Sequence, residues 1–213
     1  STRSLIELDK HYFRAWPRHT DAQFIGLDAS KPAIDYATQV GLLDVGITAN
    51  LEHHEPTPYQ AEVFSGVDMI VSTGCVGYVT RRTFRHLLAH ARLGDPPWIA
   101  SFVLRMFSYD EIADILARHG LVTEKLEGVT FVQRRFHSED ELRATITALE
   151  SRGIDPAGKE ADGLYHAELY VSRPADIVRD FPLGSVLSIT SGAGRPFGRR
   201  FHMLDNSDVK LIP

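Results

Sequence analysis

The sequence lacks the features that mark disulfide-rich, membrane-spanning or nucleic-acid-binding proteins. It has one cysteine, Cys75, which excludes an intramolecular disulfide and a cysteine-based zinc site. No apolar run approaches the roughly 20 residues that span a bilayer, and no signal peptide is visible. The formal net charge is −5 and the basic residues form no long run, which argues against a nucleic-acid partner. We therefore expect a cytoplasmic protein without a membrane or nucleic-acid partner.

What is present is an ordinary globular composition in which helical and strand patterns alternate. The 213 residues are enough for one sizeable core, with 43% hydrophobic and 24% charged residues. Apolar runs bounded by turn residues predict strands at 23–28, 45–51, 67–73, 98–104, 121–126, 129–135 and 164–171. Capped amphipathic stretches predict helices at 4–15, 31–40, 80–91, 109–119 and 138–153. We expect a helical segment at 1–22, a main domain at 23–173 and a tail at 174–213.

This alternation predicts an α/β fold, a Rossmann-like doubly wound and mostly parallel sheet with helices on both faces. The two strands on either side of Glu127-Gly128 read as an antiparallel terminal hairpin.

The most informative residue for function is Asp28. The run Phe24-Ile25-Gly26-Leu27-Asp28 reads as a buried strand that ends on an acid and turns at once into a helix with Ser30 as its N-cap and Pro32 in its first turn. Ligands bind at the carboxyl ends of parallel strands in such sheets, and an acid there commonly binds a ribose diol. The alternative is a solvated residue that only supports the helix dipole.

These features together resemble class I S-adenosylmethionine-dependent methyltransferases, over roughly residues 20–172. The resemblance is carried by the acid-ended strand Phe24–Asp28, the strand Asp68–Thr73 with its exit Gly74-Cys75-Val76-Gly77-Tyr78, and the strand Trp98–Leu104. The closing helix and strands, Tyr109–Phe136, follow in the same order. The segment Asp68–Tyr78 looks like a bacterial subgroup of undefined substrate.

The resemblance implies S-adenosyl-L-methionine as the cofactor and a small molecule as the methyl acceptor. It implies that Asp28 binds the ribose and that other positions line the cofactor site: Ala29, Ser30, Asn50, Leu51, Thr73, Gly74 and Cys75. His166 and Tyr165 are the candidate catalytic bases if the acceptor must lose a proton. Arg105 follows a strand and holds either a carboxylate or a surface salt bridge. No metal site is predicted, because His53-His54 has no companion ligands.

One element of the family pattern is missing. These enzymes open with a central strand and a glycine-rich loop, yet residues 1–22 contain no glycine. Absence of that strand would leave two strand edges unpaired. Three explanations stay open: the strand lies upstream of Ser1, another protomer of a homodimer donates it, or Val186–Thr190 with Ser191-Gly192-Ala193-Gly194 takes its place.

Two other functions stay open as well. A nicotinamide-dependent oxidoreductase also uses an acid after its second strand to bind ribose, although the terminal antiparallel pair favours the methyltransferase. A degenerate, non-catalytic binding module would account for the missing glycine loop.

Overall fold

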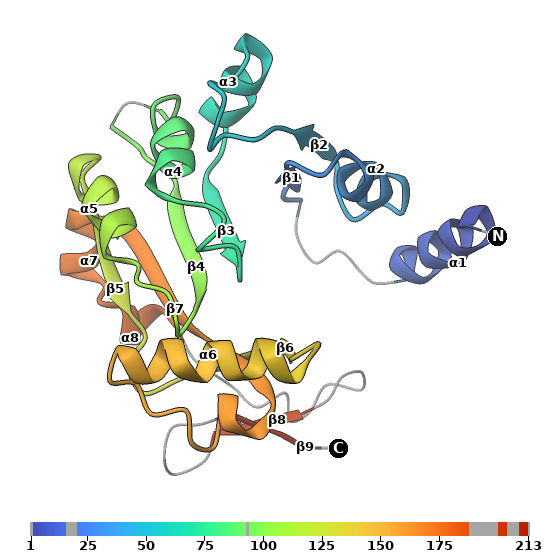
Figure 1. The fold of residues 1–213 in the computed structure, drawn as a ribbon. Helices are drawn as coiled ribbons and strands as arrows, with labels where there is room; N and C mark the ends of the chain where they lie inside the picture. Colours follow the sequence, from blue (N-terminus) through green and yellow to red (C-terminus); the bar gives the residue numbers. More distant parts are fainter. Residues whose placement is uncertain (1, 16–20, 93, 188–199, 204–208, 213) are drawn as a thin grey trace. The chain divides into compact units, whose positions relative to one another are not determined.

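A computed structural model describes residues 2–15, 21–92, 94–187, 200–203 and 209–212 (Figure 1). The chain divides into two compact units, residues 1–62 and 63–213, and each is described by itself. The division falls inside helix α3 (Pro58–Ser65), within the stretch for which the sequence predicts one domain.

The first unit is built around one strand–helix–strand crossover. After α1 (Thr2–Arg14), strand β1 (Ile25–Asp28) leads into α2 (Lys31–Gln39) and β2 (Val45–Thr48), which pairs with β1 in parallel. The Ser30 side chain accepts a hydrogen bond from the Ala33 N–H, as its N-cap position predicts. Helix α2 lies so close to β2 that a Cβ at Gly46 would be 2.6 Å from Ile34 Cγ2. Glycine is therefore required there for the helix to pack on the strand.

The second unit contains a five-stranded mixed sheet. Its strands are β3 (Met69–Thr73), β4 (Trp98–Leu104), β5 (Leu121–Lys125), β6 (Phe131–Arg135) and β7 (Leu164–Pro174). The order is β3-β4-β7-β5, and β6 also pairs with β7. Strands β3 and β4 are parallel, whereas β4, β5 and β6 are all antiparallel to β7. Figure 1 shows the long strand β7 beside β4.

The predicted hairpin at Glu127-Gly128 is wrong, although the antiparallel strands themselves are present. Strand β5 pairs with residues 170–174 and β6 with residues 164–167, so both occupy successive parts of β7 rather than pairing with each other. The eleven-residue β7 is long enough to accept both. A short loop with glycine predicts a hairpin, but the two strands instead pair one after the other along the longer strand β7.

Helices cover both faces of this sheet. On one face, α4 (Arg81–Leu88) and α5 (Asp110–Arg118) pack on β4 in a core that includes Phe84, Ile99 and Leu116. On the other face, Leu183 of α8 (Leu183–Val186), which follows α7 (Ala175–Asp180), packs with Ala100, Leu169 and Val171. Helix α6 (Glu139–Ser151) and the 3-10 turn η1 (Glu160–Asp162) connect β6 to β7. The predicted Rossmann-like α/β class is confirmed.

The pairing of β1 and β3 bears on the opening strand of the family pattern, which the sequence analysis does not find. Among the described residues, β1 pairs only with β2, and β3 pairs only with β4. Each of these two strands therefore has one edge without a strand partner among the described residues. The proposed replacement strand is not seen at Val186, which belongs to α8. Residues 188–194 lie outside the described residues, and the final pair is β8 (Arg200–Met203) with β9 (Val209–Ile212).

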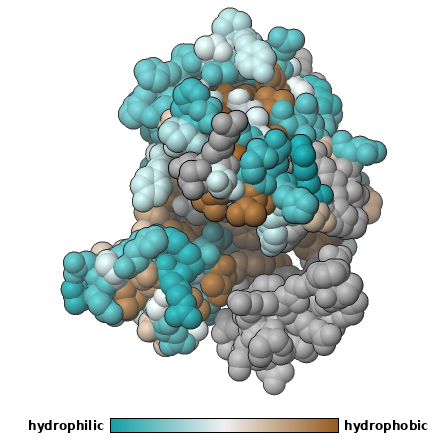
Figure 2. Space-filling view, turned by 90° about the vertical axis from the view of Figure 1, so that its right-hand side faces the viewer, coloured by the Kyte–Doolittle hydropathy of each residue, from teal (hydrophilic) through white to brown (hydrophobic). Residues whose placement is uncertain are grey.

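The described surface is mixed in character. Figure 2 shows brown apolar areas that interrupt a largely hydrophilic surface. Exposed large apolar side chains include Met69 and Val71 of the end strand β3. No described helix combines the length and hydropathy required to cross a bilayer.

Candidate functional site

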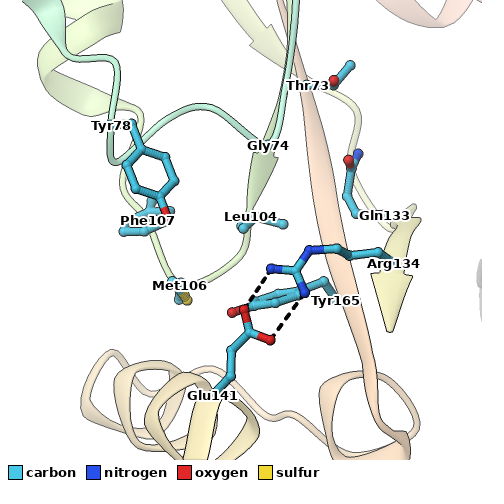
Figure 3. Close-up of a pocket in the computed structure, with 10 residues that line it drawn as sticks. All are labelled: Thr73, Gly74, Tyr78, Leu104, Met106, Phe107, Gln133, Arg134, Glu141 and Tyr165. Carbon is cyan, nitrogen blue, oxygen red and sulfur yellow. Dashed lines mark hydrogen bonds and ion pairs between the residues drawn. The ribbon is translucent and has the colours of Figure 1, made fainter. Parts of the chain in front are cut away.

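A cavity of about 230 Å³ lies at the carboxyl ends of β3 and β4, entirely within the second unit (Figure 3). Parallel strands of α/β sheets present their ligand sites at this edge. The last residues of the two strands, Thr73 and Leu104, both line it. The remaining lining residues are Gly74, Tyr78, Met106, Phe107, Gln133, Arg134, Glu141 and Tyr165.

One wall is shaped by the turn that follows β3. The Cys75 carbonyl oxygen accepts hydrogen bonds from the Tyr78 and Val79 N–H groups, which closes the turn. Gly77 has φ of 113°, and a Cβ there would be 2.6 Å from the Phe107 ring. Because only glycine tolerates this conformation and this approach, Phe107 packs directly on the turn. Tyr78, which is 84% exposed, is held beside it (Figure 3).

The opposite wall contains an ion pair between β6 and α6. Arg134 Nη2 donates to Glu141 Oε1 at 2.6 Å, and Nη1 donates to Oε2 at 3.1 Å. The Glu141 carboxylate also accepts the His137 N–H at 2.7 Å, while the Glu141 N–H is donated to Ser138 Oγ. This is a variant of the capping box, with Glu141 at the third helical position of α6. These capping hydrogen bonds therefore hold the Glu141 carboxylate in position for its ion pair with Arg134.

The hydrogen bonds from Arg134, followed by that from His137, lower the pKa of Glu141 to about 2. A carboxyl group with a lowered folded-state pKa stabilises the fold above its ordinary pKa, and this contribution is lost as the pH falls toward 2. We expect Glu141→Gln to lower the melting temperature at pH 6. The difference from the unmodified protein should shrink as the pH is lowered from 5 to 2, measured by circular dichroism.

Glu150→Gln is the matched control, because Glu150 is an exposed residue of the same helix. The difference in melting temperature between Glu150→Gln and the unmodified protein should not shrink as the pH is lowered from 5 to 2. If the difference in melting temperature between Glu141→Gln and the unmodified protein stays constant from pH 6 to pH 2, the ion pair does not have this role.

Of the two candidate bases, only Tyr165 lines the cavity. Its side chain is buried beneath Arg134, whose guanidinium carbon is 4.7 Å from the ring centroid. Burial raises the pKa of Tyr165, so its phenol stays protonated at neutral pH. His166 is the next residue on β7, and its Nδ1 is 3.0 Å from Thr130 Oγ1 in a buried position. It does not line the cavity, so the site geometry gives the predicted base role of His166 no support.

Arg105 forms an ion pair, but a buried one rather than the surface salt bridge that the sequence left open. Its side chain is 8% exposed and donates from Nη1 to Glu160 Oε2 at 2.6 Å and from Nη2 to the Asp155 carbonyl oxygen at 2.8 Å. Glu160 is itself 1% exposed. Arg105 thus forms a buried ion pair that joins the end of β4 to η1, and it is not among the residues that line the cavity.

The first unit places Asp28 as predicted, at the carboxyl end of a parallel strand. It pairs with Thr48 at the end of β2, and its side chain is exposed. Asp28 Oδ1 accepts the Ser30 N–H at 2.7 Å. No described residue donates a hydrogen bond to the other oxygen, Oδ2. The carboxylate is therefore oriented by the backbone and keeps acceptor capacity for a ligand hydroxyl.

The other predicted cofactor residues differ in what the structure shows for them. Ala29 is exposed next to Asp28, but the Ser30 hydroxyl is already used as the helix cap. Asn50 Oδ1 accepts the Glu52 N–H, which makes a local turn, and the Leu51 side chain is buried. Thr73 and Gly74 line the cavity, whereas Cys75 does not.

Of the residues that line the cavity, the sequence predicts Thr73, Gly74 and Tyr165 as site residues. Among those it does not predict are Gln133, Arg134 and Glu141. The Ser138-x-x-Glu141 spacing is a capping-box signal and predicts the position of Glu141. No local signal predicts that β6 would face the end of β3, because this depends on how both strands lie along the intervening β4 and β7.

Comparison with known proteins gives only distant similarities. No protein-family model matches the chain, and no curated protein does. Solved structures that resemble it include the plantazolicin methyltransferase BpumL in complex with a triazolic desmethylPZN analog and SAH, at 12% identity. That match covers 72% of this chain and 68% of the other, with a TM-score of 0.37. The complex with a pentazolic analog and SAH matches at 13% identity with the same coverage and TM-score. The complex of BpumL with SAH alone is 12% identical, with a TM-score of 0.37 over 72% of this chain and 67% of that one.

Proposed function

We propose that this protein transfers a methyl group from S-adenosylmethionine to a small-molecule acceptor. The observation that carries this proposal is Asp28, an exposed carboxylate at the carboxyl end of a parallel strand with one oxygen held by the Ser30 N–H. The remaining acceptor capacity suits the paired hydroxyls of a ribose. The antiparallel strands on β7 favour a methyltransferase over an oxidoreductase.

The cavity at the ends of β3 and β4 is the proposed place of the acceptor. Methyl transfer from a sulfonium is an in-line displacement that depends mainly on positioning. It requires no catalytic triad. We assign Thr73 and Gly74, which end β3 and line the cavity, to the boundary with the methionine end of the cofactor. The chain's own contribution is to bind and orient the two reactants and to exclude water.

Asp28→Ala tests the ribose assignment. Hydrogen bonds to a charged group contribute about 1.5–3 kcal/mol each, so we expect the Kd for S-adenosylhomocysteine to rise roughly 10- to 100-fold. The measurement is isothermal titration calorimetry on the full-length protein. Circular dichroism should show an unchanged fold, because the lost backbone contact to Ser30 is a single exposed hydrogen bond.

Asp35→Ala is the matched control, since Asp35 lies on α2 and forms an ion pair with the exposed Lys31. Its affinity for S-adenosylhomocysteine should equal that of the unmodified protein. Equal affinity of Asp28→Ala and Asp35→Ala would remove the assignment. Tighter binding of NAD than of S-adenosylhomocysteine in the same experiment would favour the oxidoreductase.

A non-catalytic binding module is the second candidate. It is favoured by the unpaired edges of β1 and β3 among the described residues. Absence of any cofactor binding at millimolar concentration would support it against the methyltransferase.

A further inference from the structure

We infer that the cavity beside Tyr78 and Phe107 selects an uncharged nitrogen heteroaromatic ring, which is methylated on a ring nitrogen that carries a lone pair. This inference rests on the proposed methyltransferase function and specifies its acceptor. Three observations on the lining residues carry it: their aromatic surfaces, their balanced charge and the absence of a base among them.

The aromatic surfaces come from Tyr78 and Phe107. Tyr78 is 84% exposed, although a tyrosine ring is costly to leave in water, and Phe107 is fixed beside it by its contact with Gly77. Leu104 and Met106 complete the apolar part of the wall (Figure 3). A flat ring that enters here covers the apolar surface and meets aromatic faces, which prefer stacked or edge-on contacts with another ring.

The charge of the lining is balanced. Arg134 and Glu141 are the charged residues among the described side chains that line the cavity. The two terminal nitrogens of Arg134 donate to the two carboxylate oxygens of Glu141. Neither leaves an uncompensated charge for an ionic ligand. An anion would approach a carboxylate and a cation would approach a guanidinium, so an uncharged ring is the ligand with the least electrostatic cost.

The described lining also offers no base for neutral pH. The pKa of Glu141 is lowered to about 2 by Arg134 and His137, so its carboxylate has little tendency to take up a proton. Burial raises the pKa of Tyr165, so the phenol is already protonated. An alcohol or phenol acceptor would need a base in order to react. A ring nitrogen with a free lone pair needs none.

The transfer step is balanced without a proton. The lone pair of the ring nitrogen forms the new N–C bond to the methyl group while the S–C bond breaks, and the bonding pair of the S–C bond stays on sulfur. The positive charge passes from sulfur to the ring, which leaves as an N-methyl cation beside neutral S-adenosylhomocysteine.

The first test is binding of isoquinoline to the full-length protein without cofactor, measured by saturation-transfer NMR and titration. Benzoate and benzylammonium should bind more weakly than isoquinoline. A ring contact contributes about 0.5–1.5 kcal/mol, so Tyr78→Ala and Phe107→Ala should each weaken isoquinoline binding about three- to tenfold. Phe181→Ala is the control, because Phe181 is exposed in the same unit and does not line the cavity.

Tighter binding of either ion, or unchanged isoquinoline binding by Tyr78→Ala, would overturn the inference. Tyr78→Ala is informative even if Phe107→Ala fails to fold, because the Tyr78 side chain is exposed.

The second test compares methylation of isoquinoline and of 2-naphthol with S-adenosylmethionine, followed by mass spectrometry. Isoquinoline should give its N-methyl cation, whereas 2-naphthol should give at most a trace of ether. Equal transfer to 2-naphthol would overturn the inference. If the unmodified protein binds S-adenosylhomocysteine but not isoquinoline, this inference alone is overturned. Absence of S-adenosylhomocysteine binding would overturn the proposed function and the acceptor role with it.

Discussion

Arg105→Met should lower the free energy of unfolding by about 3–5 kcal/mol, because it leaves the buried Glu160 carboxylate without its partner. Arg105 also donates to the Asp155 carbonyl oxygen, and its own carbonyl accepts from Arg152 Nη1, so the pair joins three segments of the second unit. The measurement is urea unfolding at pH 7.

The loss of stability in Arg105→Met should depend on pH. Burial already raises the pKa of Glu160, against the lowering effect of Arg105. Removal of Arg105 raises that pKa further. A carboxyl group with a raised folded-state pKa costs stability as the pH rises through that pKa, so the loss in Arg105→Met should be smaller at pH 4 than at pH 7.

Two comparisons separate the buried pair from an ordinary surface pair. Arg143→Met removes an exposed ion pair with Asp140 and should change stability by no more than about 1 kcal/mol. The double variant Arg105→Met/Glu160→Leu should recover much of the loss, because neither charge is then buried alone. A loss in Arg105→Met no larger than that in Arg143→Met would refute the account.

The features that could be predicted from the sequence are those set by neighbouring residues. The helix start at Ser30 follows from a hydroxyl that accepts the Ala33 N–H, and the place of Asp28 follows from the strand that immediately precedes it. The same holds for α6, whose N-cap Ser138 accepts the Glu141 N–H. Such signals are local, so one sequence contains them in full.

The features that could not be predicted depend on partners distant in sequence. The sequence left open whether Arg105 binds a ligand carboxylate or forms a surface salt bridge, because its partner Glu160 lies 55 positions later. The hairpin prediction was wrong because β7 pairs with both β5 and β6. The cavity likewise combines the exits of β3 and β4 with β6 and α6. No local pattern encodes these contacts, because they form only when the sheet is assembled.

Tyr109→Ala is expected to lower the free energy of unfolding by about 3–5 kcal/mol. Tyr109 is 1% exposed, its ring stacks on Tyr170 at a centroid distance of 4.8 Å, and it meets Phe84 edge-on at 6.3 Å. Its hydroxyl is 3.0 Å from Ser101 Oγ, which in turn accepts a hydrogen bond from Ser72. Truncation to alanine leaves a cavity in the core and removes this bridge between α5 and the sheet. Urea unfolding at pH 7 measures the loss.

Tyr109→Phe separates the ring from the hydroxyl and adds a second readout in alkali. At pH 7 this variant should lose only about 1 kcal/mol, the net value of a hydrogen bond.

Burial raises the pKa of Tyr109 to about 12 from its ordinary value of 10.0. The neutral phenol is thus favoured in the fold, and the stability tied to it is lost as the pH rises from 10 to 12, by roughly 3 kcal/mol. Tyr109→Phe cannot ionise at this position, so its stability should fall less than that of the unmodified protein between pH 10 and 12. Parallel alkaline curves for the two proteins would show that the Tyr109 hydroxyl is not held neutral by the core.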